Sequence, residues 1–164
     1  MVDGILRHME PDYSAQINAY SSYLHEWNAS YEEYAKSVGL SFTSLTILCA
    51  IYRTEQCTQK RLCDQCFLPK QTVNAAVAAL NKKGWVLLEE LPEDRRNKTI
   101  RFTELGSTEA KRILSKVRQS EQAAMDSLTE EERKVLLSAT RRYITGCKAA
   151  MNGLSESPDI ANSK

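Results

Sequence analysis

The sequence predicts a mainly α-helical protein of the α+β class, in which long helices at both ends flank a lobe of short helices and a β-hairpin. Apolar residues recur at three- and four-residue spacing over long stretches near both ends of the 164-residue chain, which is the period of an amphipathic helix. In the middle, two short helical segments are separated by only a few residues, and two β-prone runs follow them. The length suits one domain or two small, closely joined ones.

The first two helices are expected near the N-terminus. The first should run from about residue 12 to 37, with Asp12 as its N-cap, and Gly39 suits the position just beyond its C-terminus. Ser41 can cap a second helix. One face of this second helix carries Leu45, Leu48, Cys49 and Tyr52.

Two shorter helices follow. Thr58 opens the first, residues 66–68 form a tight link, and Pro69 fits the first turn of the second. This second helix should run to about Lys83 and end at Gly84. Its inward stripe is expected to consist of Val73, Ala76, Val77 and Leu80, which leaves outside Lys70, Gln71, Asn74, Ala75, Ala78 and Asn81.

A β-hairpin and two long helices complete the chain. Residues 85–88 and 99–103 indicate strands, and the polar segment 91–98 between them indicates a hairpin tip that carries two arginines. Thr103 can cap a helix that continues to about Ser127. Thr129 and Glu132 form a capping box for the last helix, which should end near Gly153. The polar stretch 154–164 is expected to be disordered.

This order of elements describes a winged helix-turn-helix. Residues 38–103 form this lobe, residues 1–37 form an N-terminal helix, and residues 104–153 form long C-terminal helices. The terminal helices are amphipathic and would expose apolar stripes in a monomer, so they are expected to pair in a two-fold dimer. An α-helix fits the major groove of DNA, and a basic hairpin tip beside it can reach phosphates or the minor groove.

The charge and the missing motifs narrow the function. The net charge is +1, but residues 58–103 carry nine basic and five acidic side chains whereas residues 1–57 carry three and seven, so the middle of the chain suits an anionic partner. No Gly-rich phosphate loop, nucleophile elbow or metalloprotease pattern is present, so neither an enzyme nor a cofactor is expected. No apolar run could span a membrane and no signal peptide is evident, which predicts a cytoplasmic protein.

Two segments carry a family resemblance. The stretch TQKRLCDQCFLPKQTVNAAVAALNKKGWV resembles the helix-turn-helix of the MarR family of bacterial transcription regulators (multiple antibiotic resistance type). The stretch EDRRNKTIRFTELG resembles the wing of that family. The positions that carry the match are Thr58, Gln59, Leu62, Thr72, Val73, Leu80, Lys82, Lys83 and Gly84 in the first segment, and Asp94, Arg95, Arg96, Thr103 and Gly106 in the second.

The resemblance covers about residues 12–152, and it has departures. Leu91 and Glu93 stand where the family wing has its first Asp and an Arg, so one arginine that would reach DNA is missing. Phe67 replaces the turn glycine, Pro69 the usual capping serine, and Ala75 a frequent arginine. These changes leave the expected fold intact and bear on which operator is bound.

The resemblance implies a sequence-specific regulator that binds double-stranded DNA, in most cases as a ligand-responsive repressor. Its expected partners are a palindromic operator, a second copy of the chain and a small-molecule effector. The resemblance also implies that Asp94 braces the wing and that an arginine reads the minor groove. Two alternatives stay open: a winged-helix protein-interaction module, and a thiol-based redox-sensing regulator.

The candidate DNA contacts lie on the second short helix and on the wing. Gln71 and Asn74 carry amides that suit bidentate contacts with adenine, and Lys70 suits guanine or phosphate. Without a role in DNA binding, the helix residues would form an ordinary polar surface. The two arginines would then lie in a solvated loop or form a salt bridge with Asp94. The full set of candidates is Thr58, Lys70, Gln71, Thr72, Asn74, Ala75, Arg95, Arg96 and Lys98.

Aromatic residues and cysteines are the remaining candidates. An aromatic series on the first helix should belong to the core or the dimer interface, and it consists of Tyr20, Tyr23, Trp27, Tyr31 and Tyr34. Of these, Tyr20, Tyr23, Trp27 and Tyr31 are the candidates to line an effector pocket beside the DNA-binding lobe. Cys63 and Cys66 have the spacing of half a zinc site, but no second ligand pair is evident, so no metal is predicted. They are expected to be buried free thiols, with redox sensing and metal binding as alternatives.

Overall fold

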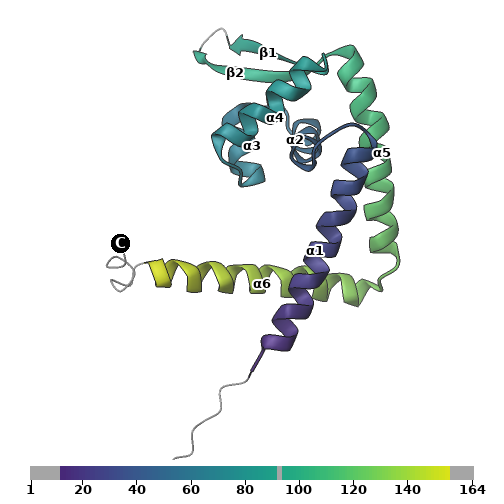
Figure 1. Ribbon diagram of the computed structural model, residues 1–164, viewed down its shortest axis with the longest axis vertical. Helices are drawn as coiled ribbons and strands as arrows, with labels where there is room; N and C mark the ends of the chain where they lie inside the picture. Colours follow the sequence, from purple (N-terminus) through teal and green to yellow (C-terminus); the bar gives the residue numbers. More distant parts are fainter. Residues whose placement is uncertain (1–11, 92–93, 156–164) are drawn as a thin grey trace, which may run out of the picture. The chain divides into compact units, whose positions relative to one another are not determined.

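The computed structural model describes residues 12–91 and 94–155 (Figure 1), without the side chains at positions 91, 94–97 and 154–155. The predicted class, mainly α-helical with one two-stranded antiparallel sheet, is confirmed. The elements in chain order are α1 (Ser14–Ser37), α2 (Phe42–Arg53), α3 (Gln59–Cys66), α4 (Lys70–Lys82), β1 (Val86–Leu91), β2 (Asp94–Phe102), α5 (Glu104–Asp126) and α6 (Glu130–Ser155). The predicted disorder of 154–164 falls almost wholly outside the described residues, and α6 runs two residues past its predicted end.

The chain forms two compact units that divide within α5. The first comprises residues 1–114 and the second residues 115–164. The first unit therefore holds α1 to α4, the hairpin and the beginning of α5, and the second holds the rest of α5 with α6. The predicted division at residues 37, 103 and 153 stays a prediction.

Local capping sets the helix ends. α1 begins at Ser14 with Tyr13 as its N-cap residue, so the predicted N-cap, Asp12, lies one residue too early. The Asp12 carboxylate accepts a hydrogen bond from the backbone N–H of Ser14 (2.9 Å). Gly39 has a φ of +71°, and the N–H of Leu40 donates to the carbonyl of Ala35 (2.9 Å), which closes α1. The Ser41 hydroxyl accepts from the N–H of Ser44 (3.1 Å) and caps α2 as predicted.

The core of the first unit joins α2, α3, α4 and the hairpin. The predicted inward stripe of α4 is buried, and so are apolar residues from each of its neighbours. Burying each large aliphatic side chain contributes about 1.5–3 kcal/mol. This core consists chiefly of Leu45, Ile47, Leu48, Leu62, Val73, Val77, Leu80, Val86 and Ile100. It fixes which face of α4 is left outside.

The hairpin differs from the prediction in where its second strand starts. β2 begins at Asp94 rather than at residue 99, so the segment expected to be a long tip is mostly strand. In the antiparallel register Glu90 pairs with Lys98 and the next pair is Leu91 with Asp94, so residues 95–97 form an irregularity in β2. A sheet with one solvent-facing side tolerates such polar residues, which the sequence pattern alone indicated as loop.

The start of α5 is fastened to the start of β1. The Thr103 hydroxyl donates to the carbonyl of Gly84 (2.7 Å) and accepts from the N–H of Gly106 (2.9 Å), as a cap should. Gly106 lies so close to Trp85 that a Cβ there would overlap the Trp85 backbone. The Thr–x–x–Gly part of the wing motif is therefore structural.

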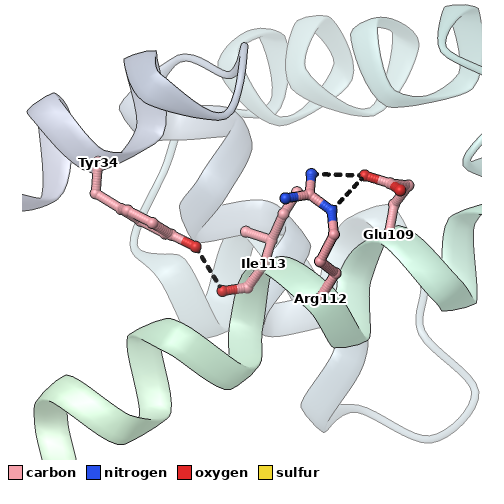
Figure 2. A network of polar contacts seen from close by, with 4 residues as sticks. All are labelled: Tyr34, Glu109, Arg112 and Ile113. Carbon is pink, nitrogen blue, oxygen red and sulfur yellow. Dashed lines mark hydrogen bonds and ion pairs between the residues drawn. The ribbon is translucent and has the colours of Figure 1, made fainter.

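A polar contact joins α1 to α5 within the first unit (Figure 2). The Tyr34 hydroxyl donates to the backbone carbonyl of Ile113 (2.8 Å). On the same helix, the Arg112 guanidinium donates to the Glu109 carboxylate at 2.7 and 3.1 Å. Burial raises the pKa of the Tyr34 hydroxyl, while the charge of Arg112 acts in the opposite direction.

Among the described helices, none is by itself long and apolar enough to cross a membrane. One pair of neighbouring helices, α1 with α2, meets the length and composition requirement jointly, but these helices are bent by 87° relative to each other.

Candidate DNA-binding surface

α4 is held in the lobe by its buried stripe and leaves its other face to solvent. Pro69 precedes the helix as its N-cap residue, which suits a ring with a fixed φ, and Gly84 follows its end with a φ of +72°. Asn81 was predicted to be simply outward. Its amide donates to the carbonyl of Val86 (2.7 Å), so it ties α4 to β1.

The predicted contact residues of α4 are not equally accessible. Lys70, Gln71 and Ala75 are exposed, whereas Thr72 and Asn74 are half-buried. The Oδ1 atom of Asn74 is closed off from solvent and finds no hydrogen-bond partner among the described residues. A bidentate contact with adenine uses both ends of the amide, so in this conformation Asn74 offers only its N–H donors.

The positive charge of the lobe lies on α3 and α4. Residues 58–84 carry five basic side chains and one acidic one, whereas residues 85–103 carry four of each. On the hairpin, Arg101 contacts Glu89 (2.9 Å) and Lys98 lies 3.6 Å from Glu90. These cross-strand pairs offset much of the wing's positive charge, and they give the predicted contact Lys98 an acidic neighbour.

The wing arginines are placed only by their backbone. Arg95 and Arg96 lie in the irregular part of β2, immediately after Asp94. Their side chains, and that of the predicted brace Asp94, lie outside the described residues. Their predicted roles remain predictions.

Thr58, a candidate DNA contact, also has a structural role at the start of α3. Its hydroxyl accepts from the N–H of Arg61 (3.3 Å) and caps α3. Its backbone also forms a bridge with Thr99 of β2, which links the start of α3 to the wing. The hydroxyl hydrogen remains able to donate to a phosphate.

Lys60 was missed by the sequence prediction. It lines a hollow of about 240 Å³ with Gln59, Cys63 and Lys70. The hollow brings a lysine of α3 and the first residue of α4 to one place, where both can attract an anion. The sequence could have indicated this residue, because Lys60 and Cys63 are three positions apart and so lie on one face of a helix.

The predicted effector residues lie along α1. Tyr20 and Tyr31 are half-buried, and Tyr23 and Trp27 are 68% and 58% exposed in the single chain. The rings of Trp27 and Tyr31 meet edge to face with centroids 5.0 Å apart. Neither the hollow beside Lys60 nor one of about 300 Å³ between α2 and β2 is lined by any of the four.

The cysteines differ from their predicted burial. Cys63 and Cys66 are only half-buried, and the buried thiol is Cys57. None of the five cysteines, all of which lie among the described residues, forms a disulfide. Burial raises the pKa of the Cys57 thiol to about 11 and also raises that of Cys66, and the nearby charge of another cysteine acts in the same direction in each case. A raised pKa lowers the thiolate fraction, which works against a redox-sensing role for these two.

The described part of the chain has no group of three or more His, Cys, Asp or Glu side chains arranged to hold a metal ion. The neighbouring carboxylates Glu89 and Glu90 are partners of basic residues of the hairpin, Arg101 and Lys98.

Comparison with known proteins decides the family. A model described as MarR family matches residues 38–97, which span α2, α3, α4 and most of the hairpin. The transcriptional regulator SarZ of Staphylococcus epidermidis is 30% identical over 115 residues, which cover 70% of this chain and 76% of SarZ. The chain belongs to the MarR family. It is thus a DNA-binding transcriptional regulator rather than an enzyme, as the sequence predicted.

Solved MarR-family structures share the fold. The DNA complex of S. aureus MepR has a TM-score of 0.67 at 19% identity and covers 84% of this chain and 99% of MepR. Bordetella bronchiseptica BpsR, whose DNA binding is regulated by 6-hydroxynicotinic acid, has a TM-score of 0.66 at 17% identity and covers 82% and 96%. The winged helix-turn-helix prediction is confirmed by these likenesses.

Proposed function

We propose that this MarR-family protein is a homodimeric repressor that recognises a palindromic operator and responds to a small molecule. The exposed face of α4 carries the proposal. Lys70, Gln71 and Ala75 are exposed there, while the opposite face is fixed in the core. A helix so anchored can present its first residues to base edges in the major groove. The MepR–DNA complex supports DNA as the ligand of this fold.

The wing and the basic helices supply binding that does not depend on sequence. Arg95 and Arg96 are the proposed contacts to phosphates or to a narrow minor groove, with Asp94 as their brace. The excess of basic residues in α3 and α4 adds attraction to any duplex. Thr58, Thr72 and Lys98 are proposed phosphate contacts at the edges of this surface.

The proposed effector acts on the aromatic residues of α1. Bound against Tyr20, Tyr23, Trp27 and Tyr31, it would change the separation of the two DNA-binding lobes of the dimer. The regulation of BpsR by 6-hydroxynicotinic acid supports a small molecule as the signal. Occupation of a promoter by the dimer would then repress transcription until the effector arrives.

The test separates the two kinds of contact. The operator is first selected from random duplex DNA, and salt titrations are then run on operator and random duplexes. Gln71→Ala should cost about 1–3 kcal/mol on the operator and much less on random DNA. Arg95→Ala or Arg96→Ala should weaken binding to both duplexes, and the salt slope should fall by about one unit for each phosphate that is no longer neutralised.

Matched controls come from the second compact unit, which begins at residue 115. Gln119→Ala on α5 and Arg142→Ala on α6 remove the same exposed side-chain types. Both should bind like the wild type. If Gln71→Ala lost affinity equally on both duplexes, α4 would not be the reader of sequence. If the wing variants bound both duplexes as the wild type does, the wing would not be part of the DNA interface.

A further inference from the structure

Phe67 is an exposed aromatic residue at the turn between α3 and α4. Its relative exposure is 82%, the largest among the exposed large hydrophobic residues of the described chain. An aromatic side chain stabilises a fold mainly through the apolar area it buries. Most of the apolar area of this ring therefore stays exposed to solvent in the single chain.

The backbone at Phe67 adds a second cost. Its φ of +54° and ψ of 39° lie in the left-handed region, which glycine adopts without strain and a residue with a Cβ does not. The turn requires this conformation here. α3 ends at Cys66, and Leu68 is restricted to extended geometry because Pro69 follows it. Position 67 is therefore the one residue that can reverse the chain direction. A glycine there would make the same turn without strain, so the turn itself does not require the phenylalanine ring.

The position of Phe67 suggests what compensates these costs. It lies three residues before Lys70, the first residue of α4, and one helical turn after Cys63, which lines the hollow with Lys60 and Lys70. The surrounding charge is positive, since α3 and the start of α4 carry Lys60, Arg61 and Lys70 against Asp64 alone. An apolar ring set among cations suits an anionic partner that also offers apolar groups. DNA does so in its major groove, where thymine presents a 5-methyl group.

We propose that Phe67 is a specificity-determining residue whose ring contacts a thymine 5-methyl group beside the bases met by the first turn of α4. This inference rests on the proposed DNA-reading role of α4. The ring would extend the readout by one position toward the edge of each half-site. The strained backbone is then retained because it holds the ring outside the lobe.

The test removes single methyl groups from the DNA. In the operator selected by the wild type, each thymine is replaced in turn by deoxyuridine, which keeps the base pair and removes only the methyl. We expect one thymine position in each half-site to respond to this replacement. There the affinity of the wild type for the operator should fall about fourfold for each buried methyl group removed. Phe67→Gly and Phe67→Asn should bind the thymine and uracil duplexes equally, because both residues tolerate the left-handed conformation and neither offers a ring.

Gln56→Gly is the matched control. Gln56 is the other described non-glycine residue with a positive φ, at +48°, and its side chain is exposed. Both glycine variants should unfold at the same or a higher temperature than the wild type, because strain is relieved. Only the Phe67 variants should lose the preference for thymine.

Several outcomes would overturn the proposal. If Phe67→Gly discriminated thymine from uracil as the wild type does, the ring would not read the methyl group and a protein would be its more fitting partner. A fall in the melting temperature of both Phe67 variants, without a fall for Gln56→Gly, would make the ring a packing residue. Failure of the proposed function is distinguishable, since Gln71→Ala would then show no selective loss on the operator.

Discussion

Gly106 owes its identity to the close approach of α5 to the start of the hairpin. Its backbone N–H is held by the Thr103 hydroxyl, and a Cβ on it would overlap the backbone of Trp85. Backbone atoms cannot move aside as the end of a flexible side chain can. Any side chain at this position must therefore displace either α5 or β1.

Gly106→Ala should consequently destabilise the protein by several kcal/mol, about the cost of severe overpacking. Gly146→Ala is the control, because Gly146 lies within α6 and a Cβ there would meet nothing within 4 Å. The control should be neutral or stabilising by up to about 1 kcal/mol, as alanine favours helix. Urea unfolding followed by circular dichroism measures both. Similar stabilities for the two variants would show that the Trp85 contact is not rigid.

Single residues also show where sequence-based prediction ends. The exposure of Lys70, Gln71 and Ala75 followed from helical periodicity, since the opposite face had to be apolar. The closed-off Oδ1 of Asn74 could not be foreseen, because it depends on neighbours brought close by tertiary packing. The left-handed conformation of Phe67 had a signal only in the family resemblance, where Phe67 replaces a turn glycine, because nothing in its own residue type favours a positive φ.

At the scale of elements, most helix starts and the presence of the hairpin were predicted, whereas the start of its second strand was not. Ser41, Thr58, Thr103 and Thr129 each cap the helix that the sequence assigned to them, since capping uses residues only three positions apart. The start of β2 depends instead on pairing with β1. That pairing admits the charged residues that a local pattern indicates as loop.

The contact between α1 and α5 is a pairing of elements that no local pattern indicates. Tyr34 is 79 positions from Ile113 in sequence, and the carbonyl that it contacts is a backbone group, so no pair of side-chain types marks the contact. The tie lies next to residue 114, where the two compact units divide within α5. α1 therefore holds the last turn of α5 that belongs to the first unit.

Tyr34→Phe should lower stability by about 0.5–1.5 kcal/mol at pH 7, because one hydrogen bond is removed. The raised pKa of Tyr34 gives a second test. The folded protein keeps this proton to higher pH than the unfolded chain, so the stability linked to it is complete below pH 10 and is lost as the pH rises through the raised pKa. The difference in stability between wild type and variant should therefore narrow above pH 10.

Tyr23→Phe supplies the control for that titration, since Tyr23 is 68% exposed. The stability of Tyr23→Phe should equal that of the wild type at every pH. A pH-independent difference between wild type and Tyr34→Phe would mean that the Tyr34 proton is not linked to folding.

At the scale of the whole molecule, a single chain leaves large apolar areas uncovered. On α1 the residues exposed by more than two fifths include Ile17, Tyr23, Leu24 and Trp27. On α6 they include Leu136, Leu137, Tyr143, Ile144 and Met151. Monomeric soluble proteins rarely expose contiguous apolar patches of this kind, so each stripe calls for a partner. A second copy of the chain is the proposed partner, and it would present two α4 helices to successive major grooves.

Charge substitutions on α6 test that partner. Leu137, Ile144 and Met151 recur every seven residues and so lie on one side of the helix, whereas Val135 lies roughly opposite at 100° per residue. Sedimentation of the wild type should give twice the 18.5 kDa chain mass at micromolar concentration. Ile144→Glu should raise the dimer dissociation constant by at least about tenfold, because a charge without a partner would be buried in the interface. Val135→Glu, also on an exposed apolar residue, should leave the mass unchanged. A wild type that sediments at the chain mass, alone and with operator DNA, would refute the two-fold arrangement, and equal effects of the two glutamates would place the interface elsewhere on α6.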